Sequence, residues 1–103
     1  MSDRTVNVCR RPTLFARSAT KHRISKERIR HVIAHCGLAF EEPAPQVSEA
    51  VDDRLIILGD DAEGRELEVM AVEGPRGELI VIHAMELRQK YRIQYEEARQ
   101  WRL

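Results

Sequence analysis

The sequence has few of the features that mark secreted, disulfide-rich or membrane-spanning proteins. Its 103 residues include only two cysteines, Cys9 and Cys36, which are too few for a disulfide framework and favour free thiols in a reducing compartment. No stretch approaches the roughly 20 apolar residues that span a bilayer, and residues 1–11 lack the apolar core of a signal peptide. The sequence therefore predicts a cytoplasmic protein without a membrane partner.

An excess of charge of one sign is also missing, because 17 Lys and Arg residues balance 17 Asp and Glu residues. A protein that holds nucleic acid by charge alone carries a strong cationic excess, so the sequence does not favour that mode of binding. The charge is polarised along the chain instead. Nine Lys or Arg residues and two acids occur in the first thirty residues, whereas residues 41–78 are rich in acids.

Several catalytic and cofactor-binding signatures are absent as well. The sequence has no Gly-rich phosphate loop, no dinucleotide fingerprint and no nucleophilic Ser or Cys with a supporting triad. His31 and His35 stand four residues apart, as zinc ligands on a helix do, but the glutamate of the H-E-x-x-H motif is missing and no third ligand is marked. We therefore expect neither a bound metal nor a cofactor.

The length and the apolar fraction of 43% fit one domain with a single core. We expect residues 1–11 to form a loose N-terminal leader and residues 12–103 to form that domain. The order of the local patterns predicts an α+β fold, with two N-terminal helices, a three- to four-stranded antiparallel sheet and a C-terminal helix.

Three segments carry helix signals. Proline suits a first helical turn, so Pro12 predicts a short helix over residues 12–18. Ser25 is a good N-cap, and the i, i+3, i+4, i+7 spacing of the apolar residues behind it predicts a helix over residues 26–36. The third predicted helix covers residues 88–102. Its apolar contacts are expected from Leu87, Tyr91, Ile93, Tyr95, Ala98 and Trp101.

Three strands separated by turn residues are predicted in the second half of the chain. They cover Arg54–Asp60, Glu66–Glu73 and Glu78–Met85. Short loops at residues 61–64 and 74–77 make both connections antiparallel hairpins. Residues 41–53, which contain Pro43 and Pro45, are predicted to be a connection ahead of the strands.

The loop lengths also predict how the strands pair. In the first hairpin we place Asp60 opposite Arg65, and in the second the four-residue loop puts Glu68 opposite His83. One face of the sheet is then wholly apolar, whereas the other carries Glu66, Glu68 and His83 among aliphatic residues. The apolar face is expected to hold Ile56, Leu58, Leu67, Val69, Ala71, Ile80, Ile82 and Ala84.

The opposed Glu68 and His83 fit two interpretations. A carboxylate beside an imidazole raises its basicity and fixes its tautomer, as a catalytic or binding site requires. The same pair can serve sheet stability alone, with a contribution of up to about 1 kcal/mol. Two outcomes are also open for the face that carries it: a homodimer forms through it, or the C-terminal helix covers it. If the helix covers it, Glu68 and His83 are expected to be buried and structural, and the best candidate site is lost.

Three segments together resemble a family of small bacterial toxins. They are Lys-His-Arg-Ile-Ser at residues 21–25, Leu-Gly-Asp-Asp-Ala-Glu-Gly-Arg-Glu-Leu-Glu-Val at residues 58–69, and Val-Ile-His-Ala-Met at residues 81–85, followed by Arg88 and Tyr91. Their order and spacing are similar to those of BrnT-type toxins, within the RelE-like ribonuclease superfamily.

The resemblance implies the toxin of a type II toxin–antitoxin system with a RelE-like fold. Such a toxin is an RNA endonuclease that needs no metal, cleaves free or ribosome-bound mRNA and so inhibits translation. Its partner is a cognate antitoxin protein, and operator DNA is bound only through that antitoxin. RNA is therefore the expected substrate.

Cofactor-free RNA cleavage needs a base for the 2′-hydroxyl proton, a cation beside the phosphorane and an acid for the leaving oxygen. We expect Glu68 or His83 to act as base or acid. His22 or Tyr91 would supply the remaining proton. The expected phosphate clamps are Arg65, Arg88 and Lys21.

Each of these residues also has a structural interpretation. Lys21 and His22 suit the end of the first helix, where cations favour the dipole. Arg65 can close an ion pair across its turn, Arg88 can be a solvated helix start, and Tyr91 can be a core residue. For the whole protein, the alternative is a non-catalytic interaction module, or an inactive toxin-like protein, that binds a partner through the sheet face.

Overall fold

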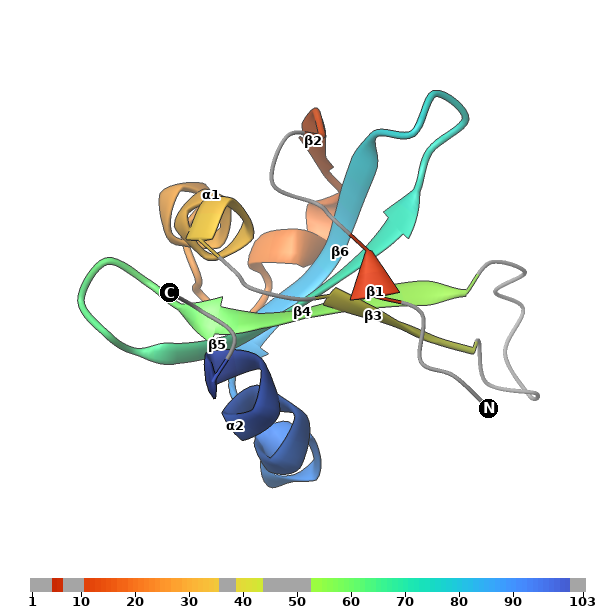
Figure 1. Ribbon diagram of the computed structural model, residues 1–103. Coiled ribbons are helices and arrows are strands. Elements are labelled where there is room, and N and C mark those ends of the chain that lie inside the picture. Colours follow the sequence, from red (N-terminus) through yellow and green to blue (C-terminus); the bar gives the residue numbers. More distant parts are fainter. Residues whose placement is uncertain (1–4, 7–10, 36–38, 44–52, 101–103) are drawn as a thin grey trace.

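The computed structural model describes residues 5–6, 11–35, 39–43 and 53–100, which build one mixed sheet with helices on both faces (Figure 1). The strands are β1 (Thr5–Val6), β2 (Thr13–Phe15), β3 (Ala39–Glu42), β4 (Arg54–Asp60), β5 (Glu66–Glu73) and β6 (Leu79–Glu86). Their spatial order is β1-β3-β4-β5-β6-β2. The helices are the 3-10 turns η1 (Arg17–Thr20) and η2 (Gln89–Tyr91) and the α-helices α1 (Lys26–His35) and α2 (Arg92–Gln100).

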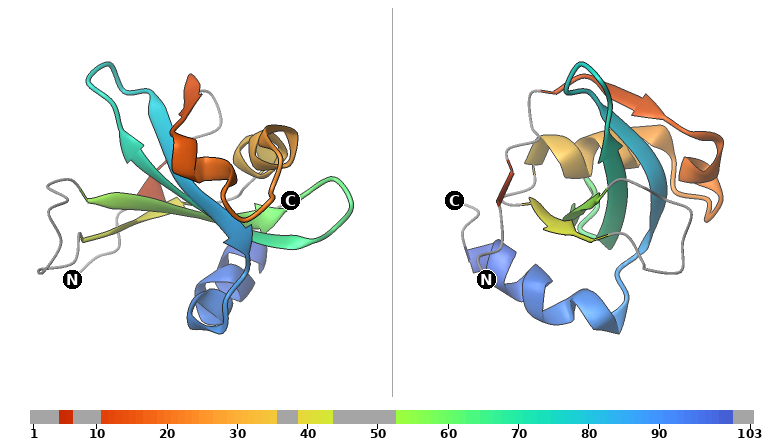
Figure 2. Two further views of the ribbon diagram at one scale, coloured as in Figure 1. Left: turned by 180° about the vertical axis from the view of Figure 1, so that it is seen from behind. Right: turned by 90° about the vertical axis from the view of Figure 1, so that its right-hand side faces the viewer.

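The helix predicted over residues 12–18 is wrong, because this segment forms β2 and then η1. β2 joins the edge of the sheet parallel to β6 (Figure 2). The Leu79 amide donates to the Pro12 carbonyl at 2.8 Å, and the Ala16 amide donates to the Val81 carbonyl at 2.8 Å. Proline lacks an amide hydrogen, but its carbonyl still pairs, so it is tolerated at the start of an edge strand.

The segment predicted as a connection from residue 41 also begins as a strand. β3 pairs antiparallel with β4, and Phe40 lies opposite Ile56. β1 pairs in turn with β3, so part of the predicted leader over residues 1–11 belongs to the sheet. Most of that leader lies outside the described residues. The same holds for the predictions on Cys9, Cys36 and Trp101.

These differences change the architecture but not the class. The fold is α+β, as predicted, but the arrangement with two N-terminal helices and a three- to four-stranded antiparallel sheet is wrong. In the described part of the chain the sheet has six strands and is mixed, and a single α-helix precedes its central strands. Short edge strands carry little periodic signal of their own, because pairing with a neighbouring strand decides their conformation.

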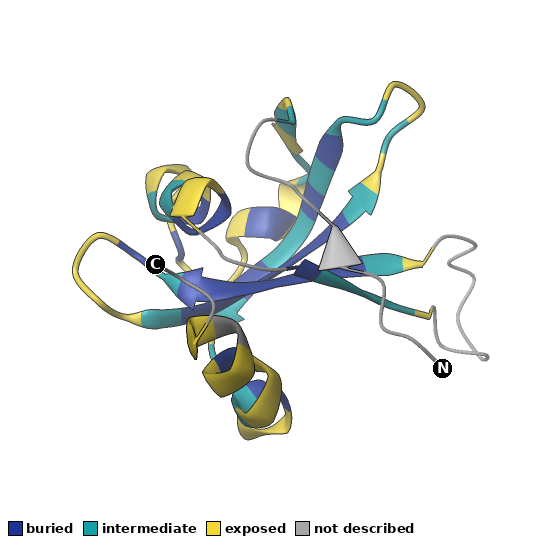
Figure 3. Ribbon diagram, viewed as in Figure 1, coloured by how far each residue is buried: buried dark blue, intermediate teal, exposed yellow. Residues whose placement is uncertain are grey.

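The helix predicted after Ser25 is confirmed as α1. The Ser25 Oγ accepts a hydrogen bond from the Arg28 amide at 3.2 Å, which is the arrangement of an N-cap. Ile29, Val32 and Ile33 are buried, as their spacing predicts. α1 therefore presents one apolar stripe to the sheet and a charged face to solvent (Figure 3).

The C-terminal helix is confirmed as α2, although the segment begins with η2 and not with an α-helix at Arg88. Tyr91 and Tyr95 are buried against the sheet. Ile93 is 72% exposed, so the apolar contact predicted for it is wrong. Ile93 is two residues from both Tyr91 and Tyr95, which is about 200° around a helix, so the face that buries the tyrosines turns Ile93 outward.

The register of the first hairpin differs from the predicted register by one residue. β4 and β5 have the predicted bounds, but Asp60 lies opposite Glu66 instead of Arg65. The Asp61 carboxylate accepts backbone hydrogen bonds from Glu63 and Arg65, each at 2.9 Å, and these shape a longer turn. A shift of one residue moves every β4 side chain to the other face, so the predicted composition of the two faces is wrong.

The second hairpin contains a bulge that the sequence pattern does not reveal. The register shifts between Ala71 and Met70, so that His83 lies opposite Met70 and Ile82 is left without a partner on β5 within the described strands. The hydroxyl of Ser18 in η1 donates to the Ile82 carbonyl at 2.6 Å. That bond gives a partner to the Ile82 carbonyl at the point where the strand ladder is interrupted.

The turn and the bulge each shift the second hairpin by one residue, because Glu73 already lies opposite Leu79 before the bulge. Glu68 lies opposite Met85, so the direct Glu68–His83 pairing is wrong. The two side chains nevertheless share a face as diagonal neighbours, with His83 Nε2 3.6 Å from Glu68 Oε2.

Two apolar clusters lie on opposite faces of the sheet. The first joins the strands to η1 and α1, and its strand residues are Ala39, Leu55, Ile57, Leu67, Val69, Ala71, Leu79, Val81 and Ala84. The second joins Ile56, Leu58 and Met70 to Tyr91 and Tyr95. Of the two outcomes left open for the second face, the C-terminal helix covers it. The face that a homodimer or docked partner was expected to use is therefore occupied. Glu68 is buried, as expected for this outcome, whereas His83 is not fully buried, because 23% of its side chain stays exposed.

Candidate functional site

A buried ion pair joins the middle of β5 to the segment that follows β6. Glu68 is 0% exposed, and Arg88 donates to it from the backbone nitrogen (2.8 Å to Oε1), Nε (2.9 Å to Oε2) and Nη2 (2.6 Å to Oε2). The hydrogen bonds to Glu68 raise the pKa of the Arg88 guanidinium above its usual value. Because both carboxylate oxygens accept hydrogen bonds from Arg88, Glu68 holds this arginine in a fixed orientation.

His83 lies beside this pair and is only partly covered, with 23% of its side chain exposed. Its Nε2 is buried, 3.6 Å from Glu68 Oε2, and has no hydrogen-bond partner among the described residues. Burial lowers the pKa of His83 below its usual value, although the Glu68 charge acts in the opposite direction. In the tautomer with hydrogen on Nε2, that hydrogen faces the carboxylate charge and Nδ1 is the basic nitrogen.

His22, in the connection between η1 and α1, places its ring against the ring of His83. The two ring centroids are 5.2 Å apart and the planes are inclined by 70°, an edge-to-face contact. His22 is exposed, so the two imidazoles experience different environments. A pair of titratable groups in unequal environments is a typical arrangement for acid–base catalysis.

A cavity of about 430 Å³ adjoins the histidine pair. It is lined by His22, Arg23, Ile24, Arg28, Arg65, Met85 and Glu86. Three arginines from the α1 connection, α1 itself and the β4–β5 turn thus face one space, against a single lining carboxylate. The cavity is therefore suited to an anion.

A buried carboxylate organises one side of this cavity. Asp61 is 3% exposed, and its Oδ2 accepts a hydrogen bond from Arg28 Nε at 2.8 Å. Its Oδ1 accepts the amides of Glu63 and Arg65. Burial alone would raise the pKa of Asp61, but the hydrogen bonds from Arg65, Arg28 and Glu63 outweigh it and lower the pKa below its usual value.

On the other side of the cavity, Arg23 adopts a backbone conformation that L-residues rarely use. Its φ of 65° lies in the left-handed region, and it is the one non-glycine residue with positive φ in the described part of the chain. The conformation costs about 1–2 kcal/mol for a residue with a Cβ. It turns the chain from η1 toward α1 and places the Arg23 side chain at the cavity.

The predicted site residues fall into three groups. His22, Glu68, His83 and Arg88 form one contiguous cluster, and Arg65 lies across the adjoining cavity. Lys21 is exposed and has no recorded contact with the cluster among the described residues.

Tyr91 is the remaining predicted site residue, and its role is structural. It is 1% exposed, and its hydroxyl donates to Glu42 Oε2 at 2.9 Å. Burial, with the bond to Glu42, raises the pKa of Tyr91 well above its usual value. The phenol is thus a core residue with a satisfied hydroxyl, in line with its structural interpretation.

Arg23, Arg28 and Asp61 are missing from the residues predicted from the sequence. Arg23 and Arg28 lie in or beside the Lys-His-Arg-Ile-Ser segment, so the local density of basic residues was a usable signal. Asp61 follows β4 within a turn sequence, where aspartate is common for reasons of turn geometry alone. Its contact with Arg28 joins residues 33 positions apart and has no sequence signature.

Among the described residues, no group of three or more His, Cys, Asp or Glu side chains is arranged to hold a metal ion. His31 and His35 stack at 4.2 Å between ring centroids, but each Nδ1 contacts a backbone carbonyl, that of Asp60 and of His31 respectively. Within the same residues, no helix has the length and apolar character needed to cross a membrane.

Comparison with known proteins adds no relative. No protein-family model matches the chain, no curated protein matches it, and no solved structure matches it. The function is therefore argued from the site itself.

Proposed function

We propose that this protein is a metal-independent RNA endonuclease that acts as the toxin of a type II toxin–antitoxin pair. The observation that carries the proposal is the contact of the His22 and His83 rings beside the Glu68–Arg88 pair. Two imidazoles of unequal exposure next to a guanidinium supply the base, the acid and the cation that RNA cleavage without a metal requires.

In the proposed reaction His83 Nδ1 accepts the proton of a ribose 2′-hydroxyl while that oxygen attacks the adjacent phosphorus. The bond from phosphorus to the 5′-oxygen breaks, and His22 donates a proton to the leaving oxygen. The products are a 2′,3′-cyclic phosphate and a 5′-hydroxyl, so no external reactant is consumed. Arg88, with 40% of its side chain exposed, compensates the charge that develops on the phosphorane.

Glu68 is a positioning residue in this scheme. Its Oε2 lies near His83 Nε2 and accepts hydrogen bonds from Arg88, so one buried carboxylate orients the base and the cation together. The arrangement resembles the orientation of a catalytic histidine by a carboxylate in other enzymes.

The antitoxin partner, the action on mRNA and the cytoplasmic setting rest on the resemblance to BrnT-type toxins. Two features of the molecule support this assignment. The segments that carry the resemblance, residues 21–25, 58–69 and 81–85, supply His22, Glu68 and His83 of one cluster. The competing interaction-module hypothesis needs an open apolar sheet face, whereas the proposed site needs only the part beside the covered cluster, where 23% of the His83 side chain and 40% of the Arg88 side chain stay exposed.

RNA cleavage by the purified protein in excess EDTA tests the proposal directly. We expect His83→Ala and His22→Ala to lower the cleavage rate by about 10²- to 10⁴-fold, the range typical of a lost acid or base. His35→Ala is the matched control, because His35 is exposed on α1 and contacts His31 instead of the cluster. Intact RNA with the unaltered protein, or equal activity of all variants, would reject the nuclease.

Growth of cells tests the toxin role separately. Production of the chain alone should arrest growth and deplete mRNA, and co-production of the product of an adjacent gene should restore growth. The His83→Ala variant should be tolerated without that neighbour. Normal growth with soluble, folded, unaltered protein would contradict the toxin assignment.

A further inference from the structure

The cavity beside the histidine pair is larger than a single proton-transfer step needs. At about 430 Å³ it has room for a phosphate and part of the nucleotide that carries it. His22 belongs to both the cavity and the ring contact with His83, so the cavity continues directly from the proposed reaction centre. An RNA strand bound at the histidines would place its next residue here.

We propose that this cavity is a subsite for the phosphate of the nucleotide adjacent to the cleaved bond, held by Arg23, Arg28 and Arg65. The inference rests on the proposed function for the orientation of the strand. It adds three residues with a binding role and assigns the chemical group that they recognise.

The charge of the cavity supports an anionic ligand. Arg23 and Arg65 are exposed, and neither side chain forms an ion pair with any described residue. Arg28 bonds to Asp61 through Nε, so its two terminal amino groups are not used in that bond. Guanidinium groups with unused donors bind phosphate by paired, charge-assisted hydrogen bonds.

The Arg28 side chain and the backbones of Arg23 and Arg65 are also held in place before any ligand arrives. Asp61 fixes Arg28 through one oxygen and the backbone of Arg65 through the other, so a single buried carboxylate positions two sides of the cavity. The strained φ of Arg23 fixes the third side. A strained backbone persists where the surrounding structure imposes it, and such residues cluster at ligand sites. Preorganised donors bind with a smaller loss of side-chain entropy.

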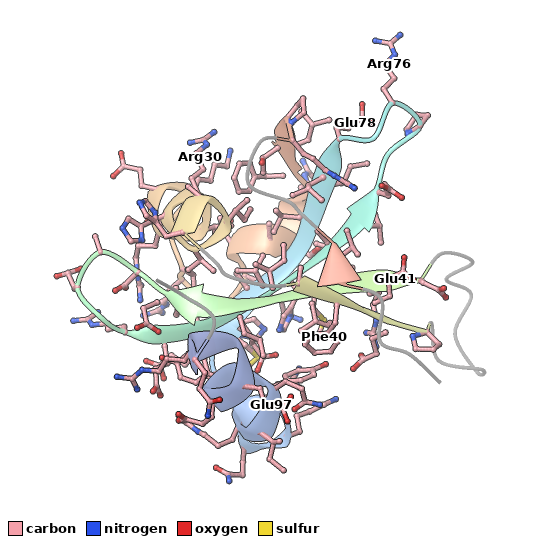
Figure 4. All side chains as sticks on the ribbon, in the orientation of Figure 1. Arg30, Phe40, Glu41, Arg76, Glu78 and Glu97 are labelled. Carbon is pink, nitrogen blue, oxygen red and sulfur yellow. The ribbon has the colours of Figure 1, made fainter. Side chains whose placement is uncertain are left out.

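A second cavity among the described residues does not suit an anion. It is lined by Glu41, Asp53, Leu55, Glu73 and Gly74, so its charged lining is acidic and would repel a phosphate. The two hairpin turns lie at opposite ends of β5, and Figure 4 shows Arg76 at the tip of the β5–β6 hairpin, away from the body of the protein. Arg76 is therefore a matched control for an exposed turn arginine outside the cavity.

Binding of an uncleavable oligonucleotide tests the subsite. The probe is a short RNA with 2′-O-methyl groups on every sugar, which removes the attacking hydroxyl but keeps the phosphates. We expect Arg65→Gln and Arg23→Gln each to weaken its binding about tenfold and Arg76→Gln to leave it unchanged. Each cavity variant should also reduce the slope of log K against log salt by about 0.7, the value for one lost single-strand phosphate contact.

A thermodynamic cycle then locates the phosphate. Single phosphates of the probe are replaced in turn by neutral methylphosphonates, and one position should weaken binding to the unaltered protein about tenfold. The same replacement should weaken binding to Arg65→Gln by a smaller factor, because that variant has already lost one of the three guanidinium groups that face the phosphate. If every position affects both proteins equally, Arg65 contacts no particular phosphate and the subsite is rejected.

The outcomes separate the subsite from the nuclease. Wild-type binding by both arginine variants, with cleavage still dependent on His22 and His83, would overturn the subsite and leave the nuclease standing. Arginine-dependent binding without any cleavage would overturn the nuclease and leave the subsite. No binding at low salt would reject the subsite, because the cavity then has no affinity for nucleic acid phosphate.

Discussion

Glu68 and Arg88 form an unequal pair, because the carboxylate is 0% exposed while 40% of the arginine side chain is open to solvent. Removing the two partners should therefore have unequal effects. Arg88→Ala leaves a buried carboxylate without its cation and should lower the free energy of unfolding by about 3–5 kcal/mol. Glu68→Gln leaves Arg88 free to be hydrated and should lower the free energy of unfolding by about 1–3 kcal/mol. Urea unfolding measures both, and equal losses would contradict this description of the pair.

His83 should set the lower limit of the pH range of RNA cleavage. Burial lowers the pKa of His83 from 6.5, so the proposed base stays neutral at pH 7 and activity should fall only below pH 6.5. The unfolded chain binds this proton more readily, so stability also falls as the pH drops through that range. An NMR titration of His83 should give the same midpoint as the rate profile.

Glu68→Gln provides a check on that assignment. The Glu68 charge raises the pKa of His83, so its removal should move the acidic limb of the rate profile to still lower pH. His35→Ala should leave the limb in place. An acidic limb above pH 6.5 would exclude His83 as the base.

Asp61 should make the fold sensitive to acid. Although burial opposes it, the bonds from Arg65, Arg28 and Glu63 lower the pKa of Asp61 below 3.8. The resulting stabilisation is present above the ordinary pKa of aspartate and is lost as the pH falls through the lower value in the folded protein. Asp61→Asn should reduce stability by about 1–3 kcal/mol at pH 7, and the difference from the unaltered protein should shrink at pH 3.

Exposed Asp53 offers the matched control for this experiment. Asp53→Asn should change stability by less than about 0.5 kcal/mol at either pH, as surface substitutions usually do. A constant difference between Asp61→Asn and the unaltered protein across the pH range would show that the Asp61 charge is not what stabilises the turn.

Tyr91→Phe distinguishes a core residue from a proton donor. The lost hydroxyl leaves Glu42 with one fewer hydrogen bond and should lower the free energy of unfolding by about 1 kcal/mol. The substitution keeps the ring, whose centroid lies 5.8 Å from the Arg88 guanidinium carbon, and removes only a hydroxyl that is bonded to Glu42, so kcat for RNA cleavage should not change. A large fall in kcat without loss of stability would show that Tyr91 takes part in catalysis.

Arg23→Gly should separate stability from binding. Glycine adopts the left-handed conformation without strain, so the substitution should raise the free energy of unfolding by up to about 1 kcal/mol after the entropy cost of glycine. The same change removes one guanidinium from the cavity and should weaken RNA binding. Thermal unfolding and oligonucleotide titration measure the two effects. A destabilised variant would show that the Arg23 side chain supports the fold.

Local signals in the sequence predicted the elements that depend on local physics. Ser25 caps α1, and the turn residues between β4, β5 and β6 gave the bounds of two strands and nearly those of the third. Gly64 and Gly77 take positive φ in those turns, which glycine adopts without strain. Capping and turn formation involve residues a few positions apart, and a single sequence contains that information.

The errors arise where distant residues decide the outcome. β2 is a strand because β6 offers an edge, and the register of the first hairpin follows from the hydrogen bonds of Asp61. The sequence brought Glu68 and His83 to one face and implicated His22, but it could not place His22 against His83. Ring contacts between separate elements, and the Arg28–Asp61 bond, exist only after the chain has folded.

The bulge at Ile82 shifts the pairing of every later β6 residue by one position and so changes the face on which each side chain lies. Without the extra residue, the alternation would continue from Val81 and turn His83 toward Val69, inside the apolar cluster beneath α1. Burying an imidazole there without a polar partner costs free energy, so the pairing without the bulge is less stable. His83 therefore helps to choose the register that brings it beside Glu68, and an aliphatic residue at this position would remove the penalty against the pairing without the bulge.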